Sequence, residues 1–507
     1  MVVAAGNARE LAAGAGAATR RVELAPGEVA LPGFTDAHIH LVDTAIAADS
    51  LDVFRADTLD DALQMVTDAA ARIPAPGWIL GSGWDQRRWG AWPHKDMLER
   101  VVPGRHVALR SFDLHALWAS PAALAAAGIS RSTPDPSGGI IRRATDGEPD
   151  GIFFEKASEV VLSKAPPPTP EMLRRAIRSI GRACLELGVV GAHELGTLFP
   201  DTSNKALDVY ASLADAGELP IRVHAGVRAD GLENALERGL RSGSRIGEAD
   251  PSRLAFGWLK LFADGTLGSR TAALLEPREG TAERGLFTNP PEFLQERTAT
   301  ASGAGIATTI HTIGDAAVRL GLDVLGPTAR SATFMPRLEH VQLCHPDDRA
   351  RFSTLGVAAS IQPIHLREDA PGARRDWGYR AESAGYTWRS LLDAGATVAL
   401  GQDAPLEPLD PWPGIALAVL RRDPTWGAEA APFGAREAIT LVEALRASTV
   451  GPWQTLRDPL GGRLVAGSHA DVVVLPSMPD EALLRSAEFG RIRPRLVLVG
   501  GETAFER

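Results

Sequence analysis

The chain has 507 residues, of which 45% are hydrophobic, and this is enough apolar material for a large folded core. Its 53 basic and 63 acidic residues give a net charge of −10, which argues against nucleic acid or an anionic membrane as the main partner and favours a small-molecule substrate. No stretch approaches the roughly 20 consecutive apolar residues of a membrane-spanning helix, so we expect no membrane association.

The N-terminus and the cysteines bear on where the protein works. The opening residues, MVVAAGNARELAAGAGAATRR, lack the basic start of a secretory signal and carry Arg9 and Glu10 among small apolar residues. The two cysteines, Cys184 and Cys344, stand in apolar surroundings and are too few for a disulfide framework. We therefore expect buried, reduced cysteines and a cytoplasmic protein, and a homodimer is compatible with the sequence.

Short apolar runs alternate with amphipathic helical stretches along most of the chain. In the helical stretch TPEMLRRAIRSIGRACLELG, Thr169 is the predicted N-cap, Pro170 takes the first helical position and Gly188 ends the helix. Strand and helix repeated eight times predict an α/β fold, the (β/α)8 TIM barrel. The predicted barrel strands are residues 28–40, 189–196, 221–227, 254–264, 305–315, 336–341, 357–365 and 397–403.

Two regions fall outside this alternation. Residues 51–168 are too long for a barrel loop and contain the strand-like runs WILGSGWD and HVALRSFDLH, so we expect a cap inserted over the barrel mouth after the first strand. Residues 1–33 and 455–507 contain short alternating runs typical of β-strands. We expect these two ends to pair into a small bipartite β-sandwich domain, which leaves residues 34–454, cap included, for the barrel.

Polar side chains gather at the predicted carboxyl ends of the barrel strands. His38 and His40 are two residues apart on a strand, so both imidazoles can reach one metal ion. His311, His340 and Asp403 close the fifth, sixth and eighth strands, and TIM-barrel active sites lie at this end. Either His311 or His340 alone is more typical of a core histidine, but the whole set predicts a metal site suited to zinc.

Lys260 is unusual because it lies in the middle of a predicted strand, within GWLKLFAD, in a chain with only five lysines against 48 arginines. An unpaired ammonium group would be costly to bury there, and burial drives it towards the neutral amine. Lys260 should therefore either pair with a carboxylate such as Asp264 or be chemically modified.

Several motifs resemble those of one known family. HIH after LPGF, KLFADGTLGSRTAAL, IHTIGDAAV, RLEHV, GQDAPLEPLDP and the closing GSHADVVVL are similar to motifs of the metal-dependent amidohydrolase superfamily, in its YtcJ-like branch, amidohydrolase family 3. This resemblance implies a binuclear centre with two divalent metal ions, preferably zinc. It assigns His38 and His40 to the first ion, His311 and His340 to the second, N6-carboxylysine at Lys260 as the bridge, and Asp403 as ligand and general base.

We accordingly expect an amidohydrolase that cleaves a non-peptide carbon–nitrogen bond of a small molecule through a metal-bridging hydroxide, with Asp403 and Lys260 as catalytic residues. The resemblance and strand position suggest His115, Arg270 and His365 as substrate-binding residues. Trp84 is a further candidate, from an aromatic group in the cap. For His115 and Trp84 the competing interpretation is a structural role inside the cap.

Other functions remain open at this point. A mono-metal deaminase of a ring nitrogen would bind one ion per chain rather than two, and a non-catalytic barrel paralogue would bind none. His193 and Glu194 lack the second histidine of an HExxH zinc motif, so we expect them in the core or behind the ligands. The sequence has no G-x-S-x-G nucleophile motif and no phosphate-binding loop, which argues against a serine hydrolase or a nucleotide-binding enzyme.

Overall fold

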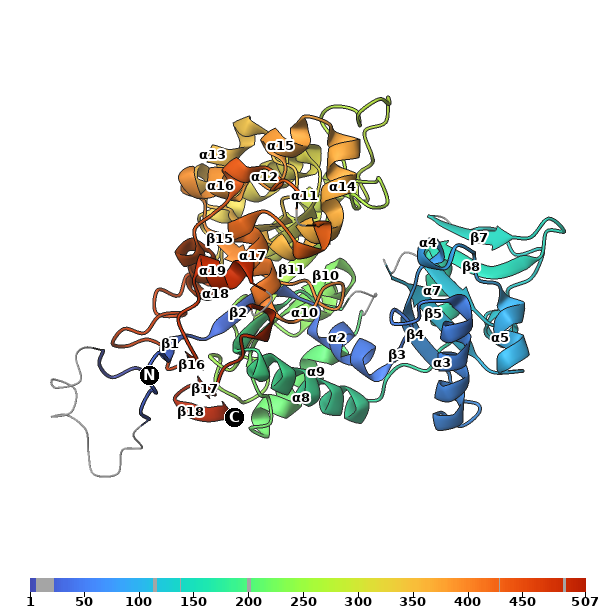
Figure 1. Ribbon diagram of the computed structural model, residues 1–507, viewed down its shortest axis with the longest axis horizontal. Coiled ribbons are helices and arrows are strands. Elements are labelled where there is room, and N and C mark those ends of the chain that lie inside the picture. Colours follow the sequence, from blue (N-terminus) through green and yellow to red (C-terminus); the bar gives the residue numbers. More distant parts are fainter. Residues whose placement is uncertain (6–21, 113–115, 137, 198–201, 428, 487–488) are drawn as a thin grey trace. The chain divides into compact units, whose positions relative to one another are not determined.

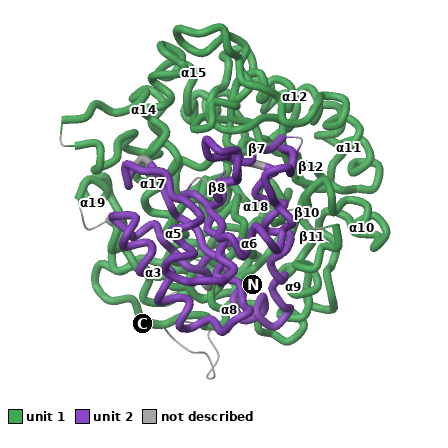
Figure 2. The backbone as a smooth tube through the Cα atoms, turned by 90° about the vertical axis from the view of Figure 1, so that its right-hand side faces the viewer, with its two compact units in different colours: residues 1–42, 177–507 green, residues 43–176 purple. Residues whose placement is uncertain are grey.

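The structure, a computed structural model, describes residues 1–5, 22–112, 116–136, 138–197, 202–427, 429–486 and 489–507. The chain forms two compact units, one made of residues 1–42 and 177–507 and the other of residues 43–176 (Figure 2). Among the helices of the described ranges, none is long and apolar enough to cross a membrane.

The first unit is built on an eight-stranded parallel sheet, in the order β15-β14-β13-β12-β11-β10-β9-β2. Figure 1 labels β2, β10, β11 and β15 of this sheet. Backbone hydrogen bonds join its first and last strands, from the Asp403 amide to the His38 carbonyl (2.7 Å) and from the His40 amide to the Ala404 carbonyl (2.9 Å). The predicted TIM barrel is confirmed. Its strands are β2 (Phe34–Ile39), β9 (Val189–Glu194), β10 (Arg222–Arg228), β11 (Leu254–Phe262), β12 (Thr308–Thr312), β13 (Arg337–His340), β14 (Ala358–Ile361) and β15 (Val398–Leu400).

The predicted first strand, residues 28–40, is two strands in the structure. β1 (Val29–Pro32) pairs antiparallel with β16 (Val472–Leu475), and only β2 belongs to the barrel. Gly33 separates them, and a Cβ atom there would lie 2.4 Å from the Val190 side chain. Because the chain passes so close to β9 at this point, it can change sheets only through a glycine.

Both ends of the chain contribute to one small antiparallel sheet, as predicted. Its order is β1-β16-β17-β18, with β17 at Leu496–Val499 and β18 at Glu502–Glu506. Arg222 of the barrel strand β10 donates two hydrogen bonds to the Asp471 carboxylate, at 2.8 and 2.9 Å. This buried ion pair ties the residue before β16 to the barrel.

Local sequence signals explain where the helices of the first unit begin and end. At α8 (Pro170–Glu186) the Thr169 hydroxyl accepts a hydrogen bond from the Met172 amide (3.2 Å), as expected for an N-cap. The other helices are α9 (Lys205–Asp215), α10 (Leu232–Glu237), α11 (Pro291–Gly303), α12 (Asp315–Ala329), α13 (Pro346–Leu355), α14 (Leu366–Trp377), α15 (Arg380–Ala384), α16 (Trp388–Asp393), α17 (Pro411–Leu420), α18 (Leu441–Thr455), α19 (Glu481–Arg485) and the short turns η1 (Ala229–Gly231), η2 (Pro363–His365), η3 (Pro424–Trp426), η4 (Ala435–Glu437) and η5 (Phe489–Arg491).

Cys184 and Cys344 are both buried and form no disulfide. Cys184 lies on α8, and burial raises the pKa of both thiols above the ordinary value. Thiols that stay protonated are poor nucleophiles, so the two cysteines act as small core residues. This agrees with the prediction.

The second unit contains a six-stranded sheet of its own, in the order β3-β4-β5-β6-β8-β7. It covers residues 43–176, somewhat more than the predicted insertion of residues 51–168. The strands are β3 (Leu51–Asp52), β4 (Ile79–Trp84), β5 (Val107–Ser111), β6 (Ala116–Ala119), β7 (Gly139–Arg143) and β8 (Pro149–Glu155). The helices are α2 (Leu41–Asp49), which begins in the first unit, α3 (Leu59–Arg72), α4 (Gln86–Trp89), α5 (Lys95–Val101), α6 (Pro121–Ala126) and α7 (Lys156–Leu162).

Trp84 lies in the hydrophobic core of the second unit. Its side chain is 0% exposed, and its indole N–H donates a hydrogen bond to the Leu109 carbonyl (2.7 Å). A side chain buried in this way presents no surface to a ligand, so the predicted substrate contact is wrong and packing within the insertion is correct. The other candidate from this region, His115, lies outside the described residues.

Candidate metal centre

The structure brings His38, His40 and Asp403 together at the carboxyl ends of β2 and β15. The Nε2 atom of His38 lies 3.3 Å from Oδ1 of Asp403, and Nε2 of His40 lies 3.5 Å from the same oxygen. All three ligand atoms lie within 4.8 Å of one another. Three ligand atoms at this spacing can surround a single divalent ion with a small adjustment.

Hydrogen bonds on the far side of each ring orient His38 and His40. Nδ1 of His38 lies 2.8 Å from Oε2 of Glu339, and Nδ1 of His40 lies 2.8 Å from the Gly196 carbonyl oxygen. The Glu339 carboxylate and the Gly196 carbonyl are acceptors, so we assign the proton of each ring to Nδ1. The lone pairs of both rings are therefore on Nε2, the atom that faces Asp403.

His311 and His340 also lie in this cluster. Their ring centroids are 4.4 Å apart, and the ring of His340 lies 4.9 Å from that of His38. Nδ1 of His340 is buried and has no hydrogen-bond partner among the described residues. Nε2 of His311, in contrast, lies 3.1 Å from the Gly265 carbonyl oxygen, so this ring has only Nδ1 left for an ion.

Two residues of the cluster have left-handed backbone conformations. His340 has a φ of 72° and Asp403 a φ of 61°. Regular alternation along β13 would place Glu339 and His340 on opposite faces, yet both contact His38. The left-handed turn at the end of β13 brings His340 into the cluster. Such conformations cost about 1–3 kcal/mol each and concentrate at functional sites.

Burial keeps His40, His311 and His340 neutral, whereas neighbouring histidines keep Asp403 ionised. Desolvation lowers the pKa of His40 and of His311 to about 3 each, and it places the pKa of His340 well below its usual value. Burial opposes ionisation of Asp403, but His38 and His365 hold its pKa well below the ordinary range. At neutral pH the cluster therefore offers imidazole lone pairs and a carboxylate, the forms that bind divalent metals.

Lys260 lies on β11 with its side chain inside the barrel. It is 1% exposed, and its Nζ atom has no hydrogen-bond partner among the described residues. Asp264 does not pair with it, because the oxygens of that carboxylate accept hydrogen bonds from the amides of Ala273, Ile313 and Gly314 at 2.9, 3.0 and 2.9 Å. Burial lowers the pKa of Lys260 to about 8, so about a tenth of it is neutral amine at pH 7 and about half at pH 8.

Glu339 is a functional residue that the sequence analysis did not identify. It is fully buried and contacts Nδ1 of His38, the Thr309 hydroxyl and Nη2 of Arg337, the last at 3.1 Å. Arg337 and Glu339 stand two residues apart in the buried strand RLEH, so they lie on one face. Opposite charges at this spacing inside an apolar strand are the signal that could have revealed the pair.

His365 contacts the cluster directly. It ends η2, and its Nε2 atom lies 3.2 Å from Oδ2 of Asp403, while Nδ1 lies 3.3 Å from Oε1 of Glu407. Burial opposes protonation, but these two carboxylates raise the pKa of His365 to about 10. Ligand atoms of His340, His365 and Asp403 form a second group within 4.8 Å of one another.

The remaining candidates have other surroundings. Arg270 is 52% exposed on the side chain, and its Nε lies 3.6 Å from Oδ2 of Asp376 in α14. Nδ1 of His193 accepts a hydrogen bond from Arg337 inside the barrel (2.9 Å). Glu194 accepts hydrogen bonds from the Leu41 amide and the Tyr210 hydroxyl. His193 and Glu194 therefore lie in the core, as predicted.

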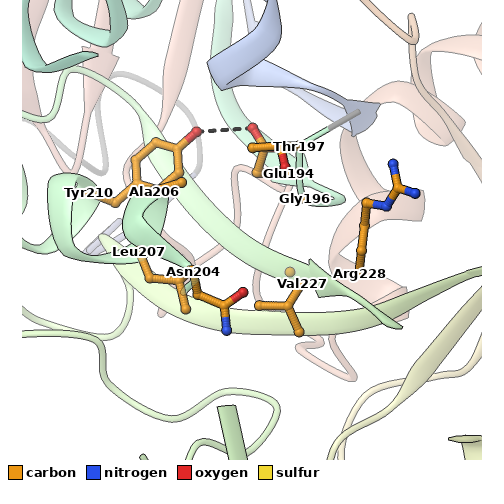
Figure 3. Close-up of a pocket in the computed structure, with 10 residues that line it drawn as sticks. Glu194, Gly196, Thr197, Asn204, Ala206, Leu207, Tyr210, Val227 and Arg228 are labelled. Atoms are coloured by element: carbon orange, nitrogen blue, oxygen red, sulfur yellow. Dashed lines mark hydrogen bonds between the residues drawn. The ribbon is translucent and has the colours of Figure 1, made fainter. Parts of the chain in front are cut away.

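A small pocket opens at the carboxyl ends of β9 and β10. Figure 3 shows Tyr210 and Arg228 on opposite sides of it, with the Tyr210 hydroxyl directed at Glu194 (3.0 Å). Gly196 lines the pocket, and its carbonyl is the one that accepts a hydrogen bond from His40. The pocket therefore adjoins the histidine cluster.

Comparisons with known proteins agree with this geometry. The sequence profile of the amidohydrolase family matches residues 25–505. YtcJ of Bacillus subtilis (strain 168), whose name assigns it to the amidohydrolases, is 28% identical over 95% of this chain and 90% of its own length. Protein LONG AFTER FAR-RED 3 of Arabidopsis thaliana is 32% identical, with 89% and 78% covered. The N-substituted formamide deformylase of Arthrobacter pascens is 28% identical, with 97% and 91% covered.

A solved structure is also similar. An uncharacterized metal-dependent hydrolase of Pyrococcus horikoshii OT3 superposes with a TM-score of 0.75 at 26% identity, covering 90% of this chain and 88% of that one. The family resemblance seen in the sequence motifs is thus confirmed by a profile match over nearly the whole chain, by relatives of similar length and by the fold. The chain belongs to the amidohydrolase family.

Proposed function

We propose that the protein is a metal-dependent hydrolase that cleaves a non-peptide carbon–nitrogen bond of a small molecule. The observation that carries this proposal is the buried amine of Lys260, which lacks a hydrogen-bond partner among the described residues although it lies within electrostatic range of Glu339, Asp403 and the histidines. One relative is named as a deformylase of N-substituted formamides, and similar solved structures are named as metal-dependent hydrolases. We assign cleavage of a carbon–nitrogen bond to this protein because of its similarity to that deformylase.

The side chains present fit a pair of divalent ions, preferably zinc. Neutral imidazoles, a carboxylate and a buried amine with no hydrogen-bond partner among the described residues form a suitable donor set. His38 and His40 would hold the first ion and His311 and His340 the second, with Lys260 and Asp403 between them. When bound, the ions would polarise the substrate carbonyl and lower the pKa of water from ~15.7 to ~7.

Lys260 becomes a suitable bridging ligand if it carries a carbamate. The neutral Nζ atom attacks the carbon of CO₂, a nitrogen–carbon bond forms, one carbon–oxygen π bond opens and the amine proton leaves to solvent. The product is an anion with two oxygens, which would provide one ligand atom for each ion. The depressed pKa of Lys260 supports this step because only the neutral amine has a lone pair to donate.

Asp403 is the residue that we assign to proton transfer. Its Oδ2 atom accepts a hydrogen bond from His365, while Oδ1 faces the Nε2 atoms of His38 and His40. Held in its ionised form, the carboxylate can take a proton from the attacking water and return it to the leaving nitrogen. Acid–base catalysis of this kind contributes roughly 10²- to 10⁴-fold.

The pocket beside Gly196 suits one substituent of a small substrate. It adjoins the histidine cluster through the Gly196 carbonyl, which accepts a hydrogen bond from His40. A location in the cytoplasm and assembly as a homodimer stay predictions.

The test combines elemental analysis with a hydrolysis screen over small N-acyl and N-formyl amines, with and without chelator. We expect two ions per chain and hydrolysis that chelation abolishes. Asp403→Asn should lower kcat by at least about 100-fold with an unchanged circular dichroism spectrum. The control is His345→Asn, because His345 is an exposed N-cap of α13 and asparagine also caps helices well.

Other outcomes would contradict this assignment. One ion per chain together with release of ammonia from a ring substrate would favour a mono-metal deaminase. A purified protein that takes up no metal under any condition would favour a non-catalytic barrel.

A further inference from the structure

We propose that His365 is itself a metal ligand, and that it joins His340 and Asp403 around the second ion. The resemblance to the family places no ligand at the end of the seventh barrel strand, and the sequence suggested only substrate contact for His365. The inference rests on the proposed metal-dependent function, and it changes which residues hold the second ion.

The first support is the distance between ligand atoms. His365 offers a nitrogen that lies, with ligand atoms of His340 and Asp403, in a group within 4.8 Å. Its Nε2 atom is 3.2 Å from Oδ2 of Asp403, and its ring centroid is 5.8 Å from that of His340. Zinc ligands at about 2.0–2.2 Å from the ion lie at most roughly 4.4 Å from one another, so closure around an ion needs only small shifts.

The second support is how Asp403 uses its two oxygens. Oδ1 faces Nε2 of His38 and of His40, and Oδ2 faces Nε2 of His365. One carboxylate thus presents Oδ1 to His38 and His40 and Oδ2 to His365.

The third support is the carboxylate behind the His365 ring. Nδ1 lies 3.3 Å from Oε1 of Glu407, and the other Glu407 oxygen accepts a hydrogen bond from Arg367 at 2.8 Å. Histidines that bind metals usually donate their second N–H to a carboxylate or a carbonyl. His38, a predicted metal ligand, has the same arrangement with Glu339. A carboxylate therefore orients His365 in the same way as it orients His38.

His311 provides the contrast. Its Nε2 atom is engaged by the Gly265 carbonyl (3.1 Å), and it falls in neither of the two groups found among the described residues. Gly265 follows Asp264, whose carboxylate is tied to the Ala273, Ile313 and Gly314 amides. The Gly265 carbonyl that contacts Nε2 of His311 therefore follows a residue held by three hydrogen bonds. Nε2 of His365, in contrast, faces Asp403.

The experiment measures the zinc content of the full-length protein and its affinity for each ion, by elemental analysis and competition with a chromophoric chelator. We expect wild type to hold two ions and His365→Ala to lose one of them. Glu407→Gln should keep both but bind the second about 10- to 100-fold more weakly, because only the orientation of His365 is lost. His345→Asn serves as the matched control and should behave as wild type.

The outcomes separate this inference from the proposed function. A wild type that hydrolyses amides with two ions, together with His365→Ala and Glu407→Gln variants of unchanged stoichiometry and affinity, would overturn the role of His365 alone. A wild type that binds no ion would overturn both. If His365→Ala fails to fold, judged by circular dichroism, Glu407→Gln decides. Cobalt-substituted protein gives a second readout, since loss of an imidazole ligand changes the visible spectrum of the bound ion.

Discussion

The ammonium group of Lys260 would be one of the most costly charges to bury in this chain, because its side chain is 1% exposed and Nζ meets no hydrogen-bond partner among the described residues. Carboxylates of Glu339 and Asp403 act against this effect, but burial is stronger and lowers the pKa to about 8. Between pH 7 and pH 9 the residue therefore changes from mostly charged to mostly neutral.

This pKa predicts how fast metal-free protein should take up CO₂. With a pKa of about 8, the neutral fraction of Lys260 rises roughly tenfold from pH 7 to pH 9. At constant dissolved CO₂, carbamate formation followed by ¹³C NMR with labelled bicarbonate should accelerate by about the same factor. Lys260→Met should lack the signal. A rate that does not change over this pH range would contradict the assignment of the carbamate to Lys260.

The ends of the barrel strands position the histidine cluster. The contact between the ends of β2 and β15 matters most. Asp36 Oδ1 accepts hydrogen bonds from the amides of His38 (3.0 Å) and Gln402 (3.1 Å), so one carboxylate joins the two strand ends. At Gly401 a Cβ atom would lie 2.4 Å from the His38 amide nitrogen. The close approach that this glycine permits sets the distance between His38 and Asp403.

Replacing that glycine should disturb fold and site together. We expect Gly401→Ala to destabilise the protein by about 1–3 kcal/mol, since the two strands must separate to admit a methyl group, and to weaken metal binding. Urea unfolding and zinc content measure the two effects. The control is Gly303→Ala at the end of α11, where a Cβ meets no atom within 4 Å. Equal effects of both substitutions would show that the β2–β15 junction has no special role.

For the whole molecule, the separation into two compact units has a thermodynamic consequence. Residues 43–176 have hydrophobic clusters of their own, one of which includes Leu63 and Trp118, while every described residue of the histidine cluster lies in the other unit. Units with separate cores can unfold separately. A bound metal stabilises only the unit that holds it.

Calorimetry should therefore reveal two unfolding transitions, and chelation should lower the midpoint temperature of only one of them. Zinc in 100-fold excess over its Kd adds about 2.7 kcal/mol to the unit that binds it, and EDTA removes this contribution. Leu63→Ala should lower the midpoint temperature of the other transition, because the cavity that it creates destabilises that unit by about 2–5 kcal/mol. The metal content should not change. A single transition, or equal shifts of both on chelation, would show that the units unfold as one.

Much of the fold could be predicted from the sequence because its signals are local. Apolar runs located the eight barrel strands, and Thr169, Pro170 and Gly188 marked the limits of α8, since caps and periodicity depend on residues only a few positions apart. The position of His38, His40, His311, His340 and Asp403 at strand ends followed from the same patterns, and the motifs identified the family.

Contacts between distant segments were decided only by the tertiary structure. Glu339 orients His38 from 301 positions away, the Gly196 carbonyl orients His40, and Glu407 orients His365. The burial of Trp84, and the absence of a hydrogen-bond partner for Lys260 in the described part of the chain, also depend on how strands and helices close around them. Local periodicity determines which residues face inward. Only the closed barrel determines which of these residues contact one another, because their contacts depend on strand register and on backbone turns such as those at His340 and Asp403.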